Sequence, residues 1–246
     1  MIERVDRASA WDRWSDADIQ TYGVKDPAPI ASFLAKVGGG RSALELGPGA
    51  GLVAFALADC GIPVVALDIS ANMCARIERD RGARPVTAVV GDMTTIDIEG
   101  SFDVIYATTS TFFSLLSQQE QIDCFASMSR VLAPDGRVVL EAFAPLRQGA
   151  VVHRQNLALR AFTDEAVDVS ATIHEPATQR ITFREVRMTH GQPMAVLPVD
   201  IRYAWPSEMD LMARLAGLTL LDRFGGWDQR AYDANCPRHV SVYGRT

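Results

Sequence analysis

The sequence predicts an α/β fold: a doubly wound, mostly parallel seven-stranded sheet with an N-terminal helical cover and an inserted antiparallel β-meander. Between residues 42 and 143, short β-rich apolar runs alternate with segments of helical period. After residue 143 the rhythm changes to several alternating runs with no helix between them. Parallel strands joined by single helices need right-handed crossovers, so helices are expected on both faces of the sheet.

A chain of 246 residues is expected to form a single domain. The formal net charge of −6 argues against a nucleic-acid partner, since such partners are bound through basic surfaces. The charged N-terminus lacks a signal-peptide core, no stretch suits a membrane span, and the four scattered cysteines are typical of reduced thiols. We therefore expect a cytoplasmic protein. Its expected parts are the helical cover 1–40, the core 41–146, the meander 147–205 and a C-terminal part of the core, 206–246.

Each element of the core follows from its own pattern. Residues 10–37 predict two helices that break at Asp26-Pro27. Residues 207–217 predict a helix, and two further strands are expected at residues 218–224 and 239–243. Between these ends, the predicted strands are SALELG, VVALDI, VTAVVGD, FDVIYAT and GRVVLEAF, and the predicted helices are LVAFALADC, NMCARIERD and QEQIDCFASMSRVL.

The segment 151–205 holds the alternating runs ALRAFT, VDVSATIH, RITFREVRMT and MAVLPVDIRYAW. Alternation of this kind predicts antiparallel strands. Two interpretations stay open. The meander is an edge extension or a homodimer contact, or it covers a small-molecule site, since insertions on a rigid scaffold often carry specificity.

A glycine-rich turn joins the first core strand to the helix that follows it. Its pattern is Glu45-x-Gly47-x-Gly49-x-Gly51. Glycines let the backbone turn sharply and let a ligand lie against main-chain N–H groups at a helix N-terminus, which suggests a nucleotide-like ligand. The dinucleotide fingerprint would need a third glycine at position 52, where this chain has Leu52.

Two carboxylates follow the turn at the ends of the next two strands. Asp68 ends the second strand, where a carboxylate can accept hydrogen bonds from both hydroxyls of a ribose. Asp92 ends the third strand and can accept an adenine amino group, with Ile69 and Met93 on either side of the ring. The alternative is that both acids only cap the turns after them.

With these motifs the chain resembles the class I S-adenosylmethionine-dependent methyltransferases. The glycine turn, the acid of the second strand and Gly91-Asp92-Met93 match that family's motif series, and the C-terminal part resembles a bacterial small-molecule branch akin to amino-sugar N-methyltransferases with a β-meander cover. The resemblance implies S-adenosylmethionine as cofactor, S-adenosylhomocysteine as product and a small-molecule acceptor in secondary metabolism. The cofactor residues that it implies are Tyr22, Glu45, Gly47, Gly49, Gly51, Asp68, Ile69, Met73, Asp92 and Met93.

Methyl transfer from a sulfonium is an in-line displacement, so it needs a positioned acceptor and, for some acceptors, a general base. The catalytic candidates are His239 at the start of the last strand, Tyr22 in the helical cover and Tyr106 near the tip of the fourth strand. A structural role competes for each of them. No metal is expected, because the fourth strand does not end in an acidic residue that would hold Mg²⁺.

Two other functions share part of this pattern. An NAD(P)-dependent oxidoreductase also has a glycine-rich turn and a ribose-binding acid, although the glycine spacing and Asp92 argue against it. A catalytically silent cofactor-binding protein would keep the same motifs. The sequence does not name the acceptor, nor whether nitrogen, oxygen or carbon is methylated.

Overall fold

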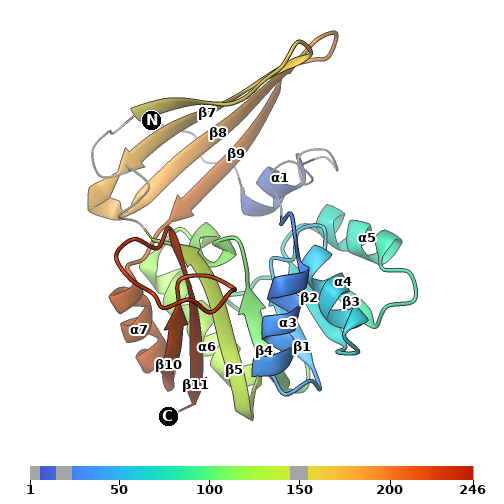
Figure 1. Ribbon diagram of the computed structural model, residues 1–246, viewed down its shortest axis with the longest axis vertical. Helices are drawn as coiled ribbons and strands as arrows, with labels where there is room; N and C mark the ends of the chain where they lie inside the picture. Colours follow the sequence, from blue (N-terminus) through green and yellow to red (C-terminus); the bar gives the residue numbers. More distant parts are fainter. Residues whose placement is uncertain (1–5, 15–23, 145–154, 246) are drawn as a thin grey trace.

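The computed structural model describes residues 6–14, 24–144 and 155–245 (Figure 1). The core is a seven-stranded sheet in the order β10-β11-β5-β4-β1-β2-β3, and β11 runs antiparallel to both of its neighbours. The predicted fold class is therefore confirmed. The strands are β1 (Ala43–Leu46), β2 (Val64–Asp68), β3 (Val86–Val90), β4 (Phe102–Ala107), β5 (Leu132–Phe143), β10 (Leu218–Phe224) and β11 (Arg238–Arg245).

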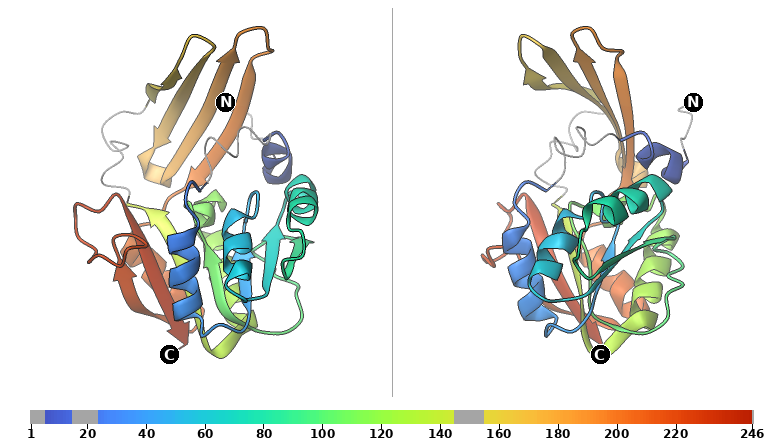
Figure 2. Two further views of the ribbon diagram at one scale, coloured as in Figure 1. Left: turned by 45° about the vertical axis from the view of Figure 1, so that its right-hand side comes forward. Right: turned by 90° about the vertical axis from the view of Figure 1, so that its right-hand side faces the viewer.

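Helices cover both faces of this sheet and enclose two apolar cores. One core packs beneath α3 and α4 around Leu34 and Val53, and the other beneath α6 and α7 around Met128 and Met209. The right-hand view of Figure 2 shows α3 and α6 on opposite sides of the sheet. The helices are α1 (Arg7–Trp11), α3 (Ala28–Val37), α4 (Leu52–Asp59), α5 (Ala71–Asp80), α6 (Gln118–Val131) and α7 (Pro206–Leu215).

The strand order places the ligand site. The chain moves outward from β1 to β2 and β3 on one side, and from β4 to β5 on the other. Ligands of open α/β sheets bind outside the carboxyl ends of the strands at such a switch point. β1 pairs with β2 and with β4 in parallel, so the glycine turn after β1 opens at that point.

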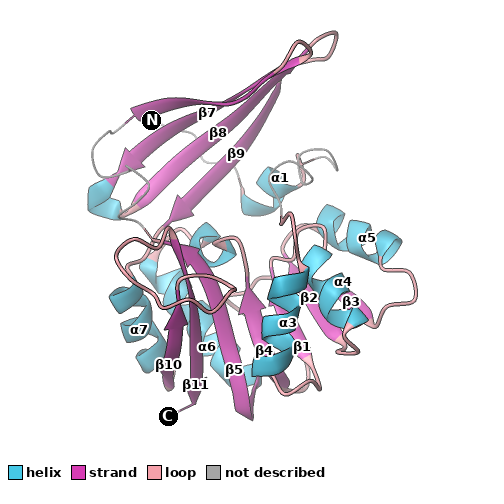
Figure 3. Ribbon diagram, in the orientation of Figure 1, coloured by secondary structure: helices cyan, strands magenta, loops and turns pink. Residues whose placement is uncertain are grey.

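The predicted meander is a separate four-stranded antiparallel sheet in the order β6-β7-β8-β9. It stands beyond the carboxyl ends of the core strands and consists of strands except for a short 3₁₀ turn, η3 (Pro176–Thr178) (Figure 3). Its strands are β6 (Gln155–Phe162), β7 (Ala166–Glu175), β8 (Arg180–Thr189) and β9 (Ala195–Arg202).

A buried polar network fixes the base of the meander to the core. Arg202 at the end of β9 donates to Gln121 Oε1 of α6 at 2.6 Å and to Glu208 Oε1 of α7 at 2.7 Å. The Gln121 amide in turn donates to the Arg202 carbonyl at 2.8 Å. Buried charges persist when they are paired and hydrogen-bonded in this way, so the network orients the meander firmly over the strand ends.

Some boundaries differ from the prediction. Helix α1 begins before residue 10, because Asp6 caps it by accepting a hydrogen bond from the Ser9 N–H at 3.1 Å. The second half of the predicted first helix falls partly on residues 15–23, outside the described residues. Strand β5 starts at Leu132, directly after α6, rather than at Gly136. A one-turn 3₁₀ helix, η1 (Thr111–Ser114), was not predicted, because four residues are too few to show a period.

Among the described helices, none is both long and apolar enough to cross a membrane.

Candidate active site

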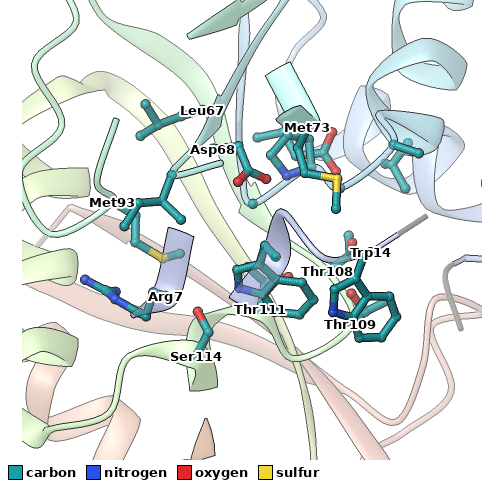
Figure 4. A pocket seen from close by; sticks show the side chains of 18 of the residues that line it. Arg7, Trp14, Leu67, Asp68, Met73, Met93, Thr108, Thr109, Thr111 and Ser114 are labelled. Atoms are coloured by element: carbon teal, nitrogen blue, oxygen red, sulfur yellow. The ribbon is translucent and has the colours of Figure 1, made fainter. Parts of the chain in front are cut away.

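A cavity of about 320 Å³ lies at the carboxyl ends of the core strands (Figure 4). That volume falls within the range of small-molecule sites, about 300–1,000 Å³. The glycine turn and the ends of β2 and β3 form one wall, and the segment after β4 forms another. Arg7 and Trp11 of α1 and Val199 of β9 also line the cavity. The N-terminal helix and the meander therefore both contribute to it.

The glycines of the turn have distinct roles. Gly47, Gly49 and Gly51 have φ of 61°, 56° and 77°, a region that disfavours side chains with a Cβ. At Gly47 a Cβ would overlap the Cγ2 atom of Thr111, whereas at Gly49 it would meet nothing within 4 Å and would point into open space. Gly47 and Gly49 line the cavity, but Gly51 does not; it is the N-cap residue of α4.

Glu45 brings a buried carboxyl group to the floor of the cavity. Its side chain is 1% exposed, and its Oε2 atom accepts a hydrogen bond from the Tyr106 hydroxyl at 3.1 Å. Burial raises the pKa of Glu45 to about 8. Tyr106 is fully buried and is not among the lining residues, and burial raises its pKa well above the usual value. The structure therefore directs the Tyr106 hydroxyl to Glu45 and does not place it in the cavity wall.

Asp68 also faces the cavity, beside Ile69 and Met73. Its Oδ1 atom accepts from the Ser70 N–H at 2.8 Å, so the carboxylate is held at the strand end by the turn that follows. Burial raises the pKa of Asp68 to about 6. The Ser70 hydroxyl donates to Asp12 Oδ1 at 2.5 Å, which links the segment after α1 to the start of α5.

Asp92 lies at the end of β3, with Met93 beside it in the cavity wall. Its Oδ2 atom accepts from Arg7 Nη2 at 2.7 Å, and its Oδ1 atom accepts from both the N–H and the hydroxyl of Thr94 at 2.9 Å. Figure 4 shows Arg7 and Met93 among the side chains around the cavity. Sequence reasoning missed Arg7, because nothing in an isolated arginine indicates a partner 85 positions away.

The structure does not bring His239 to the cavity. The ring is fully buried in β11, where His239 pairs with Ala142 of β5, and its Nδ1 atom lies 2.8 Å from Ser241 Oγ. It packs edge-on against Tyr232, and burial lowers its pKa to about 3. The enclosed imidazole lies against Tyr232 of the loop before β11 and is not among the described residues that line the cavity. Tyr22, the third candidate, lies outside the described residues.

The comparisons with known proteins agree with this geometry. A family model described as a methyltransferase domain matches residues 43–136. The chain is 31% identical over 207 residues to the cypemycin N-terminal methyltransferase of a Streptomyces species, with 84% of each chain covered. The structure of the CcbJ methyltransferase from Streptomyces caelestis superposes with a TM-score of 0.86, at 33% identity, over 97% of this chain and 96% of that one.

A more distant structure shares the fold. CalS10, an amino pentose methyltransferase from Micromonospora echinaspora, superposes with a TM-score of 0.70 at 21% identity, over 89% of this chain and 90% of that one. The relatives support methyl transfer and not the oxidoreductase alternative. The chain belongs to the family of S-adenosylmethionine-dependent methyltransferases.

Proposed function

We propose that this enzyme methylates a nitrogen atom of a small-molecule amine in natural-product biosynthesis. The observation that carries the proposal is the charge around the cavity. The described lining residues include three carboxyl groups, Glu45, Asp68 and Asp92, against one guanidinium, Arg7, which is paired with Asp92. These carboxyl groups would also serve the cofactor, so their excess over cationic groups disfavours an acidic acceptor without itself binding the amine.

Two tryptophans add to the preference for a cation. Trp11 and Trp14 both line the cavity, with ring centroids 5.4 Å apart and planes tilted by 38°. Cations bind favourably over the faces of tryptophan rings, and such contacts strengthen where water is excluded. One relative supports the same acceptor atom, since the cypemycin enzyme is named as an N-terminal methyltransferase.

The residues around the glycine turn fit the cofactor. Asp68 would accept hydrogen bonds from the ribose hydroxyls, and Asp92 and Met93 would hold the adenine. Glu45 would orient the methionine end, and the open space at Gly49 would let the cofactor lie against the backbone. Bound there, the cofactor supplies an electrophilic methyl group on sulfur.

The chain's own contribution to the chemistry is positioning. The acceptor nitrogen uses its lone pair to form the new N–C bond as the C–S bond breaks, sulfur keeps the electron pair, and the N–H proton leaves to water. Among the described residues that line the cavity there is no histidine, lysine or tyrosine. The described residues therefore contribute proximity and the exclusion of bulk water.

A panel of acceptors tests the proposal. Methyl transfer from S-adenosylmethionine with a labelled methyl group is measured for an alanyl tripeptide, a prolinamide and an amino sugar. Matched hydroxy analogues and matched carboxylic acids are the controls. We expect label to appear in amines and in none of the controls. Label confined to the hydroxy or carboxylate compounds would contradict the proposed acceptor class.

Cofactor affinity is expected to depend on pH. Burial raises the pKa values of Glu45 and Asp68 to about 8 and about 6, whereas their ionised forms are the ones that accept hydrogen bonds from an ammonium or ribose hydroxyls. Binding of S-adenosylhomocysteine must then release protons, so its affinity should rise between pH 6 and pH 8, by at most about tenfold per pH unit for each proton released.

Calorimetric titration in two buffers of different ionisation enthalpy measures this proton release. The Glu45→Gln variant is the control, because it should lose the part of the pH dependence above pH 7. An affinity that stays level across this range in the wild type would show that neither carboxyl group responds to the cofactor.

The assembly and the location of the protein remain proposals. Val199 of β9 lines the cavity, which favours a cover over the acceptor as the role of the meander. A homodimer through the meander and a cytoplasmic location stay predictions from the sequence.

A further inference from the structure

One face of the meander is turned toward the cavity. Residues that pair directly across antiparallel strands share a face, and Val199 of β9, which lines the cavity, pairs with Phe183 of β8. In the next row along the same strands, Leu197 pairs with Glu185, and Glu185 pairs with Ser170 of β7. Because side chains alternate with a period of two, Glu185 lies on the same face as Val199.

Glu185 is a buried carboxylate with an unused oxygen. Its side chain is 8% exposed, and its Oε1 atom accepts a hydrogen bond from the Ser170 hydroxyl at 2.7 Å. Its Oε2 atom has no hydrogen-bond partner within the described part of the chain. Asp168 lies in the following row of the same face and forms an ion pair with Arg187 at 3.1 Å. Glu185, by contrast, forms no ion pair with a described lysine or arginine.

The apolar neighbours of Glu185 connect it to the cavity. Leu197, its direct partner across β9, packs in one cluster with Trp14 and Met73. Both Trp14 and Met73 line the cavity. Glu185 is not itself among the described residues that line the cavity; it lies on the same face of the meander as Val199, behind the cluster that Leu197 forms with Trp14 and Met73.

Burial without a partner costs stability, because a desolvated charge loses its hydration and gains nothing in return. Natural folds keep few such groups, and each one calls for a physical reason. A protonated amine would satisfy Glu185 by donating to Oε2, and its charge would face the tryptophan rings.

We propose that Glu185, oriented by Ser170, binds the protonated amino group of the acceptor and so selects amines. This inference rests on the proposed function, namely that the acceptor is an amine. The acceptor binds at Glu185 as an ammonium ion. The bound acceptor molecules that then lose a proton to water have a free lone pair on nitrogen, and these are the molecules that are methylated. Glu185 is in this account the specificity-determining residue that the meander supplies.

The first test needs no acceptor. Glu185→Gln keeps the size of the side chain and an oxygen for Ser170 but removes the charge. An unpaired buried charge lowers the stability of the folded state. Removing this charge should therefore raise the Tm of the variant by about 2–4 °C. Glu175→Gln is the matched control, since it removes the same charge from an exposed position on neighbouring β7. A fall in Tm specific to Glu185→Gln would show that the carboxylate is structural and would overturn the inference.

The second test uses the amines of the acceptor panel at saturating S-adenosylmethionine. We expect Glu185→Gln to raise KM for the amine at least tenfold, while the Kd for S-adenosylhomocysteine changes less than threefold and Glu175→Gln resembles the wild type. An unchanged KM in Glu185→Gln, with the wild type methylating the amine, would overturn this inference and leave the proposed function standing. A wild-type enzyme that methylates none of the amines would instead contradict the proposed function.

Discussion

Gly49→Val should abolish binding of S-adenosylhomocysteine, with a loss of affinity of about 100-fold or more. Gly49 has φ of 56°, and a Cβ at this position would meet no protein atom within 4 Å, so the branched side chain would stand in the cavity. A β-branched residue in this backbone region also carries strain of about 1–3 kcal/mol. Strain destabilises the turn, and the side chain excludes the ligand.

Gly39→Val separates these two effects. Gly39 has φ of 66°, is exposed, and would also place its Cβ in open space, but it lies in the turn before β1, away from the cavity. We expect a similar loss of stability in thermal unfolding with wild-type affinity in calorimetry. Wild-type affinity in a folded Gly49→Val protein would show that the turn only reverses the chain.

Asp68→Ala should weaken S-adenosylhomocysteine binding by about 1.5–3 kcal/mol, which is roughly 10- to 150-fold. The carboxylate lines the cavity at the end of β2, and the Ser70 N–H fixes its Oδ1 atom at 2.8 Å. Removing it takes away the acceptor for the ribose hydroxyls. The measurement is a calorimetric Kd at pH 8, where the pKa of Asp68, raised by burial to about 6, leaves the group ionised.

Asp59→Ala is the control for the change of charge, because Asp59 is exposed at the end of α4 and pairs with Arg84. We expect it to bind S-adenosylhomocysteine as the wild type does. If Asp68→Ala and Asp59→Ala bound S-adenosylhomocysteine with equal Kd values, Asp68 would not contribute to cofactor binding.

The residues predicted best from the sequence are those whose signal is local. Gly47 and Gly49 follow a short apolar strand directly, and Asp68 and Asp92 end the next two strands, so chain order alone brings them to one edge of a parallel sheet. The structure places all four around the same cavity. The strand that begins at residue 238 was also predicted, because alternation and a preceding glycine-rich loop mark it.

The site residues that could not be predicted from the sequence depend on contacts between segments far apart in the chain. Arg7 meets Asp92 only because the fold brings α1 to the residues after β3, and Glu185 shares a face with Val199 only because β8 pairs with β9 in one register. The surroundings of His239 have the same origin. Its strand was placed correctly, but the pairing of His239 with Ala142 in the buried middle of the sheet encloses the ring beside Tyr232, and no local pattern shows that.

Nitrogen as the proposed site of methylation can be tested against oxygen within a single acceptor molecule. An amino sugar that carries an amine and several hydroxyls is incubated with S-adenosylmethionine bearing a ¹³C-labelled methyl group, and the product is analysed by NMR. Both kinds of acceptor atom then compete within one molecule at one cavity. We expect the labelled carbon to be bonded to nitrogen. A labelled carbon bonded to oxygen, with the amine unmodified, would contradict this expectation.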